Sequence, residues 1–501
     1  MIVTATLMDS PKLPVFLLIL AFVFGAFCVN FSWVHDYHNS DSFLLAFISR
    51  EVYTPYYWGD NRYGMPVPWL ASWISDYRYN LLFQTQIMIL AAFANAVVFQ
   101  GWFLHRCTGL TAPNLSVAAL SLIGCILVLR PTHQTAHVLA LAHPYLISLL
   151  PLLVGVALLF RSRRGPLFLR SAIAGICFAL SFWINLSHVA LALGLVVLLP
   201  VLDCTYRRSL TLRLLSCSLV FAAGAGVFWH ASRYPRLAEL KIAPISTIPN
   251  AVYLLTSNTF TWFLHPVGMS VLVVLLLLAM AVQHRRKTFA LHYRVADAAV
   301  FLALAVTFAL AMAALDWVAM NNHEARYWTT SMILILLVMT GWLASALFRW
   351  LEKATGSPSL ASTSCALLLL AVVVNAFGAS SPAAALGRID RVTGARVQSI
   401  RALGCTHLVG SYWDTWISVF HQRSHGYLPT LWAITSRSEV AERLWASFPP
   451  EDRRYCQVCG DPMTEYFRIH FRLPPLRPSS QHGTICRLEP VPASSSTAQA
   501  N

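Results

Sequence analysis

Charged residues are scarce in this sequence of 501 residues: they make up 11% of the chain, against about 25% in an ordinary soluble domain. Acidic residues are the rarer kind, with 21 Asp and Glu against 36 Lys and Arg. Hydrophobic residues make up 57%. Because no soluble core needs so much apolar surface, this composition excludes an ordinary water-soluble fold.

The formal charge of +15 would suit a nucleic-acid-binding protein, but the arrangement of the basic residues does not. The sequence lacks a basic stripe with interleaved aromatic residues, which nucleic-acid grooves require. Most of the excess lies in short loops between apolar runs. We therefore exclude nucleic acid as a partner.

Long apolar runs separated by polar residues extend from residue 13 to residue 377. A membrane-spanning helix needs roughly 20 residues to cross ~30 Å of hydrocarbon, so we predict an all-α polytopic membrane protein with about eleven transmembrane helices. The predicted spans are residues 13–31, 81–104, 115–129, 144–160, 171–184, 188–202, 214–229, 267–282, 295–315, 329–348 and 364–377.

The positions of Lys and Arg predict the orientation, because basic loops resist translocation. With the N-terminus inside, the inner loops hold about twice as many basic residues as the outer ones. An odd number of spans then puts the C-terminus outside. The first apolar run is too long for a removed signal peptide and lacks a small-residue cleavage site, so we expect a retained helix.

Two regions are not short loops, and they define the expected domains. Residues 1–378 form a multi-span transmembrane domain with a large first outer loop at 32–80. Residues 379–490 form a small α/β outer domain, and residues 491–501 form a disordered tail rich in Ser and Ala. Within the outer domain we expect short mixed elements at 401–409 and 412–420 and an amphipathic helix at 436–448.

Four cysteines lie in the outer domain: Cys405, Cys456, Cys459 and Cys486. An oxidising compartment would permit disulfides there. The pair Cys456 and Cys459 also has half the spacing of a zinc site, so both interpretations remain open, with disulfides favoured.

The first outer loop holds the strongest candidate for chemistry, Asp41. An amphipathic helix follows at 43–50 and could lie along the membrane surface, with Asn39, Ser40 or Asp41 as its N-cap. A carboxylate at this boundary could accept a proton from a nucleophilic hydroxyl or hold a divalent metal against a phosphate. The alternative is a plain helix cap.

A second candidate site lies between two late spans, where Glu324, Arg326 and Tyr327 precede a helix. An arginine at headgroup depth can bind a lipid-linked phosphate through its planar fork, with Glu324 orienting it. The alternative is an interfacial anchor that snorkels to the headgroups. His38 and His323 also map to the outer side, where histidines could bind metal or phosphate but are also common at the interface.

These pieces together resemble the GT-C superfamily of membrane glycosyltransferases, especially bacterial relatives of protein O-mannosyltransferases and lipid A aminoarabinose transferases. The matching stretches are Asn39-Ser-Asp41-Ser-Phe-Leu, the helix ending at Arg50-Glu51, and Glu324-Ala-Arg326-Tyr327-Trp. The nearest likeness is to an uncharacterised bacterial group whose first loop continues as residues 57–66. The outer-domain stretch Tyr412-Trp413-Asp414 is similar to the Trp-Trp-Asp motif of oligosaccharyltransferases, but its flanks differ and we assign it no role.

The resemblance implies roles for particular residues. Asp41 would be the catalytic base, or the ligand of a divalent metal if one is used. Arg326 would bind the donor phosphate, with Glu324 and Tyr327 as partners. Asp36, His38 and His323 would be auxiliary. The acidic pair usual in the family is altered here, because Asp36 lies five residues before Asp41.

The implied function is transfer of a sugar from a polyprenyl-phosphate donor to a glycan, lipid or protein acceptor at the outer face of a bacterial inner membrane. Two alternatives remain. A transporter or flippase of a lipid-linked substrate would carry ionisable or broken segments at mid-membrane, whereas the polar residues here gather at the outer rim. A non-catalytic membrane subunit would need neither site.

Overall fold

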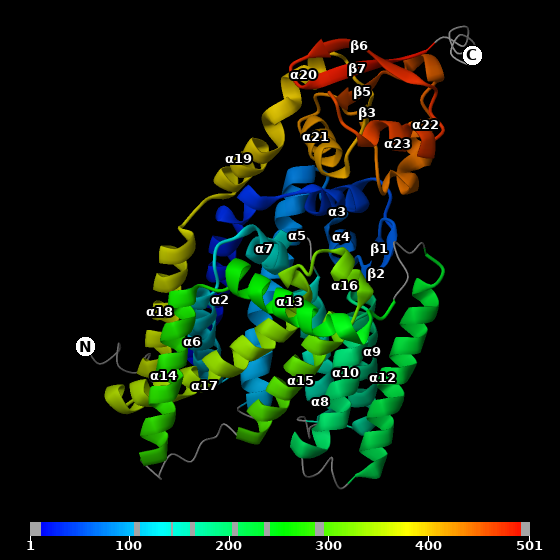
Figure 1. The fold of residues 1–501 in the computed structure, drawn as a ribbon. Coiled ribbons are helices and arrows are strands. Elements are labelled where there is room, and N and C mark those ends of the chain that lie inside the picture. Colours follow the sequence, from blue (N-terminus) through cyan, green and yellow to red (C-terminus); the bar gives the residue numbers. More distant parts are fainter. Residues whose placement is uncertain are drawn as a thin grey trace. The chain divides into compact units, whose positions relative to one another are not determined.

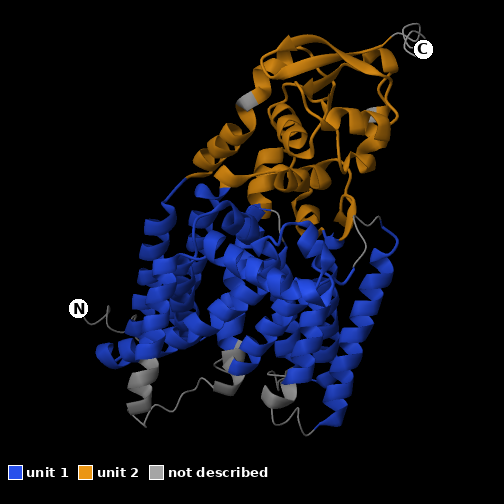
Figure 2. Ribbon diagram, in the orientation of Figure 1, with its two compact units in different colours: residues 1–34, 62–64, 85–380 blue, residues 35–61, 65–84, 381–501 orange. Residues whose placement is uncertain are grey.

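The computed structural model describes residues 12–104, 111–141, 144–160, 166–202, 209–234, 241–285 and 295–491. These residues form two compact units, drawn in different colours in Figure 2. Unit 1 consists of Met1–Val34, Arg62–Gly64 and Thr85–Ser380. Unit 2 consists of His35–Asn61, Met65–Gln84 and Ser381–Asn501. The first outer loop, which the sequence analysis placed wholly in the transmembrane domain, is divided between the two units.

Unit 1 is helical, and each of the predicted apolar runs lies in one of its longer helices (Figure 1). These helices are α2 (Lys12–Asn30), α5 (Tyr77–Val98), α6 (Ala112–Val128), α8 (Tyr145–Phe160), α9 (Leu167–Ile184), α10 (His188–Leu202), α12 (Leu210–Ala231), α13 (Ile248–Trp262), α14 (Pro266–Arg285), α15 (Val295–Ala313), α17 (Thr329–Thr355) and α18 (Pro358–Phe377). Shorter helical turns join them: η2 (Phe99–Leu104), α7 (His133–Ala136), η3 (His137–Leu141), η4 (Ile245–Thr247), α16 (Asp316–Met320) and η5 (Ala325–Trp328).

In the part of the chain that the structure describes, six helical segments are long and apolar enough to cross a membrane. The count is seven if His133–Leu141 and Tyr145–Leu159, which meet at a 49° bend, form one broken span. Four further apolar helices are shorter than a full span: Ala112–Val128, His188–Leu198, Pro266–Leu278 and Ala299–Ala313. The fold is that of a membrane protein, while the number of eleven spans stays a prediction.

Helix α13 is absent from the predicted spans because its sequence is too polar to stand out as an apolar run. Two of its threonines turn inward to the helix backbone: Thr256 Oγ1 donates to Val252 O at 2.7 Å, and Thr259 Oγ1 donates to Leu255 O at 2.7 Å. Hydroxyls satisfied in this way do not oppose a helix in an apolar setting.

Buried polar side chains join the helices of unit 1. Gln100 Nε2 donates to Ser121 Oγ at 3.0 Å and to Leu337 O at 2.9 Å, and Ser121 Oγ lies 2.7 Å from Thr340 Oγ1. Gly341 packs directly against the Gln100 amide, leaving no room for a Cβ atom. Small residues and interhelical hydrogen bonds of this kind are typical of helix contacts inside membranes.

Unit 2 combines pieces of the first loop with the C-terminal segment. The loop forms η1 (Trp33–Tyr37), α3 (Ser40–Arg50), β1 (Tyr56–Tyr57), β2 (Asp60–Gly64) and α4 (Pro66–Ala71), of which Trp33, Val34 and Arg62–Gly64 belong to unit 1. The helices of the C-terminal segment are α19 (Pro382–Thr393), η6 (Gly394–Arg396), α20 (Val397–Ala402), α21 (Tyr412–Ser424), η7 (Ser438–Ala441), α22 (Glu442–Ala446), η8 (Pro450–Asp452) and α23 (Met463–His470).

The sheet of unit 2 has five strands in the order β4-β3-β5-β7-β6. The strands are β3 (His407–Val409), β4 (Trp432–Ile434), β5 (Tyr455–Val458), β6 (Leu476–His482) and β7 (Ile485–Pro490). Strand β3 pairs in parallel with β4 and β5, in register His407 with Trp432 and with Tyr455. Strand β7 pairs antiparallel with β5 and β6. The expected small α/β region is therefore present at the C-terminus.

The four cysteines of unit 2 form two disulfides, which decides between the two interpretations of their spacing. Cys405, just before β3, is bonded to Cys456 in β5. Cys459, just after β5, is bonded to Cys486 in β7. The interpretation of Cys456 and Cys459 as half a zinc site is wrong, because disulfide sulfurs do not ligate metals as thiolates.

Helix α3 is not the surface-lying amphipathic helix that the sequence suggested. Its apolar side chains from Phe43 to Ile48 are all buried, and within unit 2 they pack on α21. The Phe43 ring centroid lies 4.4 Å from that of Phe420, and the Phe47 centroid lies 5.1 Å from that of Trp416. The helix therefore belongs to the core of the unit, with no apolar face left for lipid.

The amphipathic helix predicted for residues 436–448 is present only in part, as two consecutive short turns, η7 (Ser438–Ala441) and α22 (Glu442–Ala446). A left-handed residue, Arg437 with φ +71°, precedes the short turns η7 and α22. Ser438 Oγ donates to Thr435 O at 2.6 Å and so closes a tight turn at this point. Local side-chain hydrogen bonds of this type compete with a continuous helix. The expected disordered tail, residues 491–501, falls outside the described residues except for its first residue.

Candidate functional site

Asp41 lies in the first turn of α3, in unit 2, and Asn39 is the N-cap of this helix. Asn39 Oδ1 accepts from Ser42 N, and Ser42 Oγ accepts from Asn39 N at 3.0 Å, which completes a capping box. The alternative of Asp41 as the helix cap is therefore wrong. Its carboxylate still benefits from the positive end of the helix dipole.

Two tyrosine hydroxyls converge on the Asp41 carboxylate. Tyr412 Oη, at the start of α21, donates to Oδ1 at 2.6 Å. Tyr57 Oη, in β1, lies 3.2 Å from the same oxygen and 3.2 Å from Tyr412 Oη. Burial, and then the charge of Asp41, raises the pKa of both tyrosines well above its usual value. Both hydroxyls therefore keep their protons and act as donors.

Arg437 completes this group, which we call the Asp41 cluster: Asp41, Tyr57, Tyr412 and Arg437. The Arg437 Nη1 atom lies 3.8 Å from Asp41 Oδ1, and both side chains are 15% exposed. The guanidinium carbon stands 4.4 Å from the ring centroid of Tyr57 and 5.3 Å from that of Tyr412. A cation stacked on two rings is held in place even where its carboxylate contact is long.

All polar contacts of the Asp41 carboxylate fall on one oxygen. Among the described residues, none donates a hydrogen bond to Oδ2. One oxygen thus fixes the carboxylate in place, while the other can accept a proton from a substrate hydroxyl or ligate a cation.

The proposed auxiliary residues of the first loop serve other contacts. Asp36 Oδ2 forms an ion pair with Arg388 Nη1 at 2.6 Å and takes no part in the Asp41 cluster. His38 Nδ1 lies 2.9 Å from Ser42 Oγ, and its Nε2 lies 2.7 Å from His35 Nδ1. The structure therefore forms no acidic pair from Asp36 and Asp41.

Arg326 lies in η5 of unit 1, at the start of α17. Its Nε atom is 2.9 Å from Glu324 Oε2, and the Arg326 side chain is 17% exposed. Its Nη2 lies 3.4 Å from Asn321 Oδ1 and 3.4 Å from Tyr327 Oη. The structure thus joins three residues that the sequence had grouped: Glu324, Arg326 and Tyr327. His323 contributes a backbone carbonyl, which accepts from Asn258 Nδ2 at 2.8 Å.

Two further tyrosines stand close enough to Arg326 to interact with its charge: Tyr63 of the first loop and Tyr145 of α8. We call these five residues the Arg326 cluster: Tyr63, Tyr145, Glu324, Arg326 and Tyr327. Gly64 holds Tyr63 there, because a Cβ atom at position 64 would lie 2.8 Å from Trp183 Cδ1 and closer still to its carbonyl oxygen.

Unit 1 also contains an apolar cavity of about 270 Å³. It is lined by helices α13, α14, α15 and α17, and by Trp328, two residues after Arg326. Trp328 Nε1 donates to Ala309 O at 3.0 Å, which fixes the ring at this position. An apolar cavity of this kind is suitable for a hydrocarbon chain.

Five of these residues were not predicted as site residues: Tyr57, Tyr63, Tyr145, Tyr412 and Arg437. Tyr57 and Tyr63 lie in the stretch 57–66 that carried the likeness to one bacterial group, and Tyr412 opens the stretch that we had given no role. The sequence therefore contained a signal for Tyr57, Tyr63 and Tyr412. Arg437 gave no signal, because its position on two aromatic rings depends on a fold of distant segments.

Of the described residues, one group of three metal-ligating side chains is clustered, Asp390, His421 and His425, and Asp41 is not part of it. The chain matches no protein-family model and no curated protein.

Proposed function

We propose that this chain is a membrane glycosyltransferase of GT-C type that uses a polyprenyl-phosphate sugar at the outer face of a bacterial inner membrane. The observation that carries the proposal is that one short stretch of the first loop supplies both clusters. Tyr57 contacts the Asp41 carboxylate, and Tyr63, six residues later, stands by Arg326.

In the proposed reaction the acceptor hydroxyl oxygen attacks the anomeric carbon of the donor sugar. The hydroxyl proton passes to Asp41 Oδ2, and the bond between the anomeric carbon and the phosphate oxygen breaks. The electron pair leaves with the polyprenyl phosphate. Arg326 would stabilise the developing charge, an electrostatic role that is stronger where water is excluded. The apolar cavity beside Trp328 would hold the first part of the lipid chain.

The proposal gives each cluster one task. Tyr57 and Tyr412 would orient the Asp41 carboxylate through Oδ1 and leave Oδ2 for the acceptor. Glu324 would orient Arg326 through the 2.9 Å contact between Oε2 and Nε, and the guanidinium would bind phosphate oxygens. Acceptors of this reaction would be glycans, lipids or proteins that carry a free hydroxyl.

The test is donor cleavage by the purified full chain in lipid nanodiscs. Synthetic short-chain polyprenyl-phosphate sugars are offered with envelope glycans and lipids as acceptors, and release of polyprenyl phosphate is measured. We expect Asp41→Asn to lower turnover by a factor of roughly 10²–10⁴, as for loss of a general base. The matched control is Asp36→Asn, which removes a carboxylate of the same loop that pairs with Arg388.

Three outcomes of this test would contradict the proposal or change it. Equal turnover in the wild type and Asp41→Asn would contradict the role of Asp41. In proteoliposomes, movement of the donor across the bilayer without cleavage would replace the proposal with transport. Loss of turnover in Asp36→Asn alone would transfer the catalytic role to the other carboxylate of the loop.

A further inference from the structure

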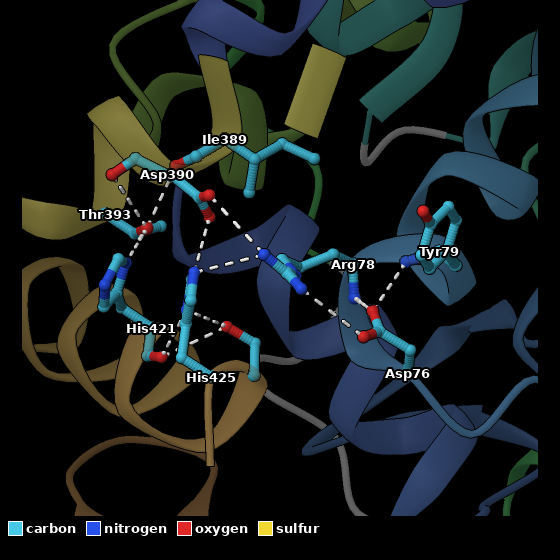
Figure 3. A network of polar contacts seen from close by, with 9 residues as sticks. Asp76, Arg78, Tyr79, Ile389, Asp390, Thr393, His421 and His425 are labelled. Atoms are coloured by element: carbon cyan, nitrogen blue, oxygen red, sulfur yellow. Dashed lines mark hydrogen bonds and ion pairs between the residues drawn. The ribbon is translucent and has the colours of Figure 1, made fainter. Parts of the chain in front are cut away.

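Unit 2 contains a group of three potential metal ligands away from the Asp41 cluster (Figure 3). Asp390 lies near the end of α19, His421 in the last turn of α21, and His425 directly after that helix. Their ligand atoms all lie within 4.8 Å of one another. The two imidazole rings are four residues apart and stack with centroids 4.3 Å apart. We call these three residues the Asp390 cluster.

Hydrogen bonds fix which ring nitrogen of His421 is available. Thr393 Oγ1 donates to Ile389 O at 2.9 Å, and in that arrangement it accepts from His421 Nδ1 at 2.6 Å. The proton is then on Nδ1, and Nε2 has a lone pair. A neutral imidazole whose other nitrogen donates to a fixed oxygen is the usual state of a metal-ligating histidine.

His425 shows the same pattern. Its Nδ1 lies 3.1 Å from His421 O, a carbonyl that can only accept, and 3.1 Å from Ser424 Oγ, which can donate or accept. In the tautomer that donates from Nδ1 to His421 O, the lone pair is on Nε2, which faces Asp390 Oδ1 at 3.2 Å. Asp390 Oδ1 is buried and has no hydrogen-bond donor among the described residues. Two acceptor atoms at this separation repel each other unless a cation or a proton lies between them.

Arg78 currently supplies positive charge at this point. Its Nη1 lies 3.1 Å from His425 Nε2 and 3.5 Å from Asp390 Oδ2, as Figure 3 shows. Its Nη2 also lies 3.6 Å from Asp76 Oδ2, so the guanidinium has a second carboxylate to which it can move. The space beside His425 Nε2 and Asp390 thus accepts a cationic group. The Arg78 guanidinium can leave this space and still pair with Asp76.

We propose that Asp390, His421 and His425 bind one divalent transition-metal ion of the zinc class. Two imidazole nitrogens and a carboxylate oxygen form a known ligand set for zinc, with a fourth position left for water. Arg78 then moves to Asp76. The ion joins α19, the first helix of the C-terminal segment of unit 2, to the end of α21. The site is separate from Asp41 and does not depend on the proposed function.

The test is metal binding by the purified full chain in detergent, with any affinity tag removed and bound metal stripped by a chelator. Cobalt(II) is titrated as a spectroscopic probe, and zinc(II) is then added to displace it. We expect one equivalent of cobalt to give the visible absorption of a four-coordinate ion. We expect one equivalent of zinc to abolish that absorption.

Variants separate a built site from loose binding by surface histidines. Asp390→Asn should weaken binding about a hundredfold or more, since it removes a charged ligand with little change of shape. Thr393→Val removes only the hydroxyl behind His421 and should weaken binding about 10–100-fold, as for other outer-shell partners. The matched control is His470→Gln, which removes an exposed histidine paired with Glu439 and should change nothing.

Arg78→Gln should change the affinity for cobalt in the opposite direction to Asp390→Asn and Thr393→Val. If the guanidinium only competes with the metal, its removal should tighten cobalt binding about tenfold, whereas a variant that merely damaged unit 2 would weaken it. Absence of the absorption in the wild type would overturn the proposal. Equal affinity in the wild type, Asp390→Asn and Thr393→Val, or loss of binding in His470→Gln alone, would also overturn it.

Discussion

At the scale of single residues, the Asp41 carboxylate is held more firmly than a helix start requires. Asn39 already caps α3, so the contacts of Asp41 with two tyrosines and Arg437 do not serve the cap. Burying a carboxylate beside two hydroxyls costs free energy unless every contact is satisfied, yet one oxygen is left open. This pattern is typical of a site in which a group outside the chain completes the contacts.

Tyr412→Phe tests whether those contacts position Asp41. The change removes the hydroxyl 2.6 Å from Oδ1 but keeps the ring beside Arg437. We expect kcat to fall roughly tenfold with KM nearly unchanged, because a hydrogen bond to a charged group contributes about 1.5–3 kcal/mol. Kinetics of donor cleavage measure it. Tyr466→Phe is the control, since the Tyr466 side chain is exposed on α23 and far in sequence from the site. Full activity in Tyr412→Phe would leave the hydroxyl a purely structural group.

Arg326→Lys distinguishes a phosphate-binding arginine from an interfacial anchor. Lysine keeps the charge but loses the planar fork, so two parallel hydrogen bonds to phosphate are no longer possible. We expect the KM for a short-chain polyprenyl-phosphate sugar to rise about tenfold or more, with normal expression. The matched control is Arg233→Lys. In the wild type the Arg233 guanidinium carbon lies 3.7 Å from the centroid of the Trp229 ring, as expected of an interfacial anchor. If Arg326→Lys has the kinetics of the wild type, Arg326 is an interfacial anchor like Arg233 and does not bind the donor phosphate.

At the scale of elements, the two halves of the first loop are fixed by different means. Helix α3 is held by aromatic packing on α21 and by the partly buried pair of Glu51 Oε1 and Arg423 Nη2 at 2.7 Å. The segment after β1 is held by a close approach to α9, where Leu186 N donates to Arg62 O at 3.3 Å and Gly64 touches Trp183. The position of Tyr63 therefore depends on the next residue, Gly64, because only glycine fits this close to Trp183.

Gly64→Ala tests this dependence. The new Cβ would overlap the backbone of Trp183, which cannot yield as the end of a flexible side chain can. We expect a loss of about 1–3 kcal/mol in stability, as for overpacking elsewhere, and a larger loss of activity as Tyr63 moves. Thermal unfolding and donor cleavage are measured on the same sample. Gly226→Ala in α12 is the control, because its Cβ would meet nothing within 4 Å. An unchanged unfolding temperature in Gly64→Ala would contradict the close approach.

At the scale of the whole molecule, the sequence predicted what depends on local composition. Apolar runs predicted the helices of unit 1 except α13, Asn39 was one of three candidate caps, and disulfides were the favoured interpretation of the four cysteines. It did not predict that α3 is buried on α21, because the amphipathic pattern of residues 43–50 is equally suitable for a lipid surface and for a protein partner. Tyr412 and Arg437 reach Asp41 from positions 371 and 396 residues away, and no pattern over a short window reports such contacts.

The orientation in the membrane is the property on which the whole proposal depends, and it can be measured directly. The excess of Lys and Arg in alternate loops predicts that the C-terminal segment faces the outer side and that residues 161–165 face the cytoplasm. Ser480 lies exposed in β6, so Ser480→Cys should react with a membrane-impermeant maleimide added to intact cells. Ser162→Cys should react only after the cells are permeabilised. The unmodified chain gives the background from its free cysteines, of which Cys28, Cys125 and Cys365 are buried. Reaction of Ser480→Cys only in permeabilised cells would reverse the orientation, and Asp41 would then face the cytoplasm, where the proposed outer-face reaction could not take place.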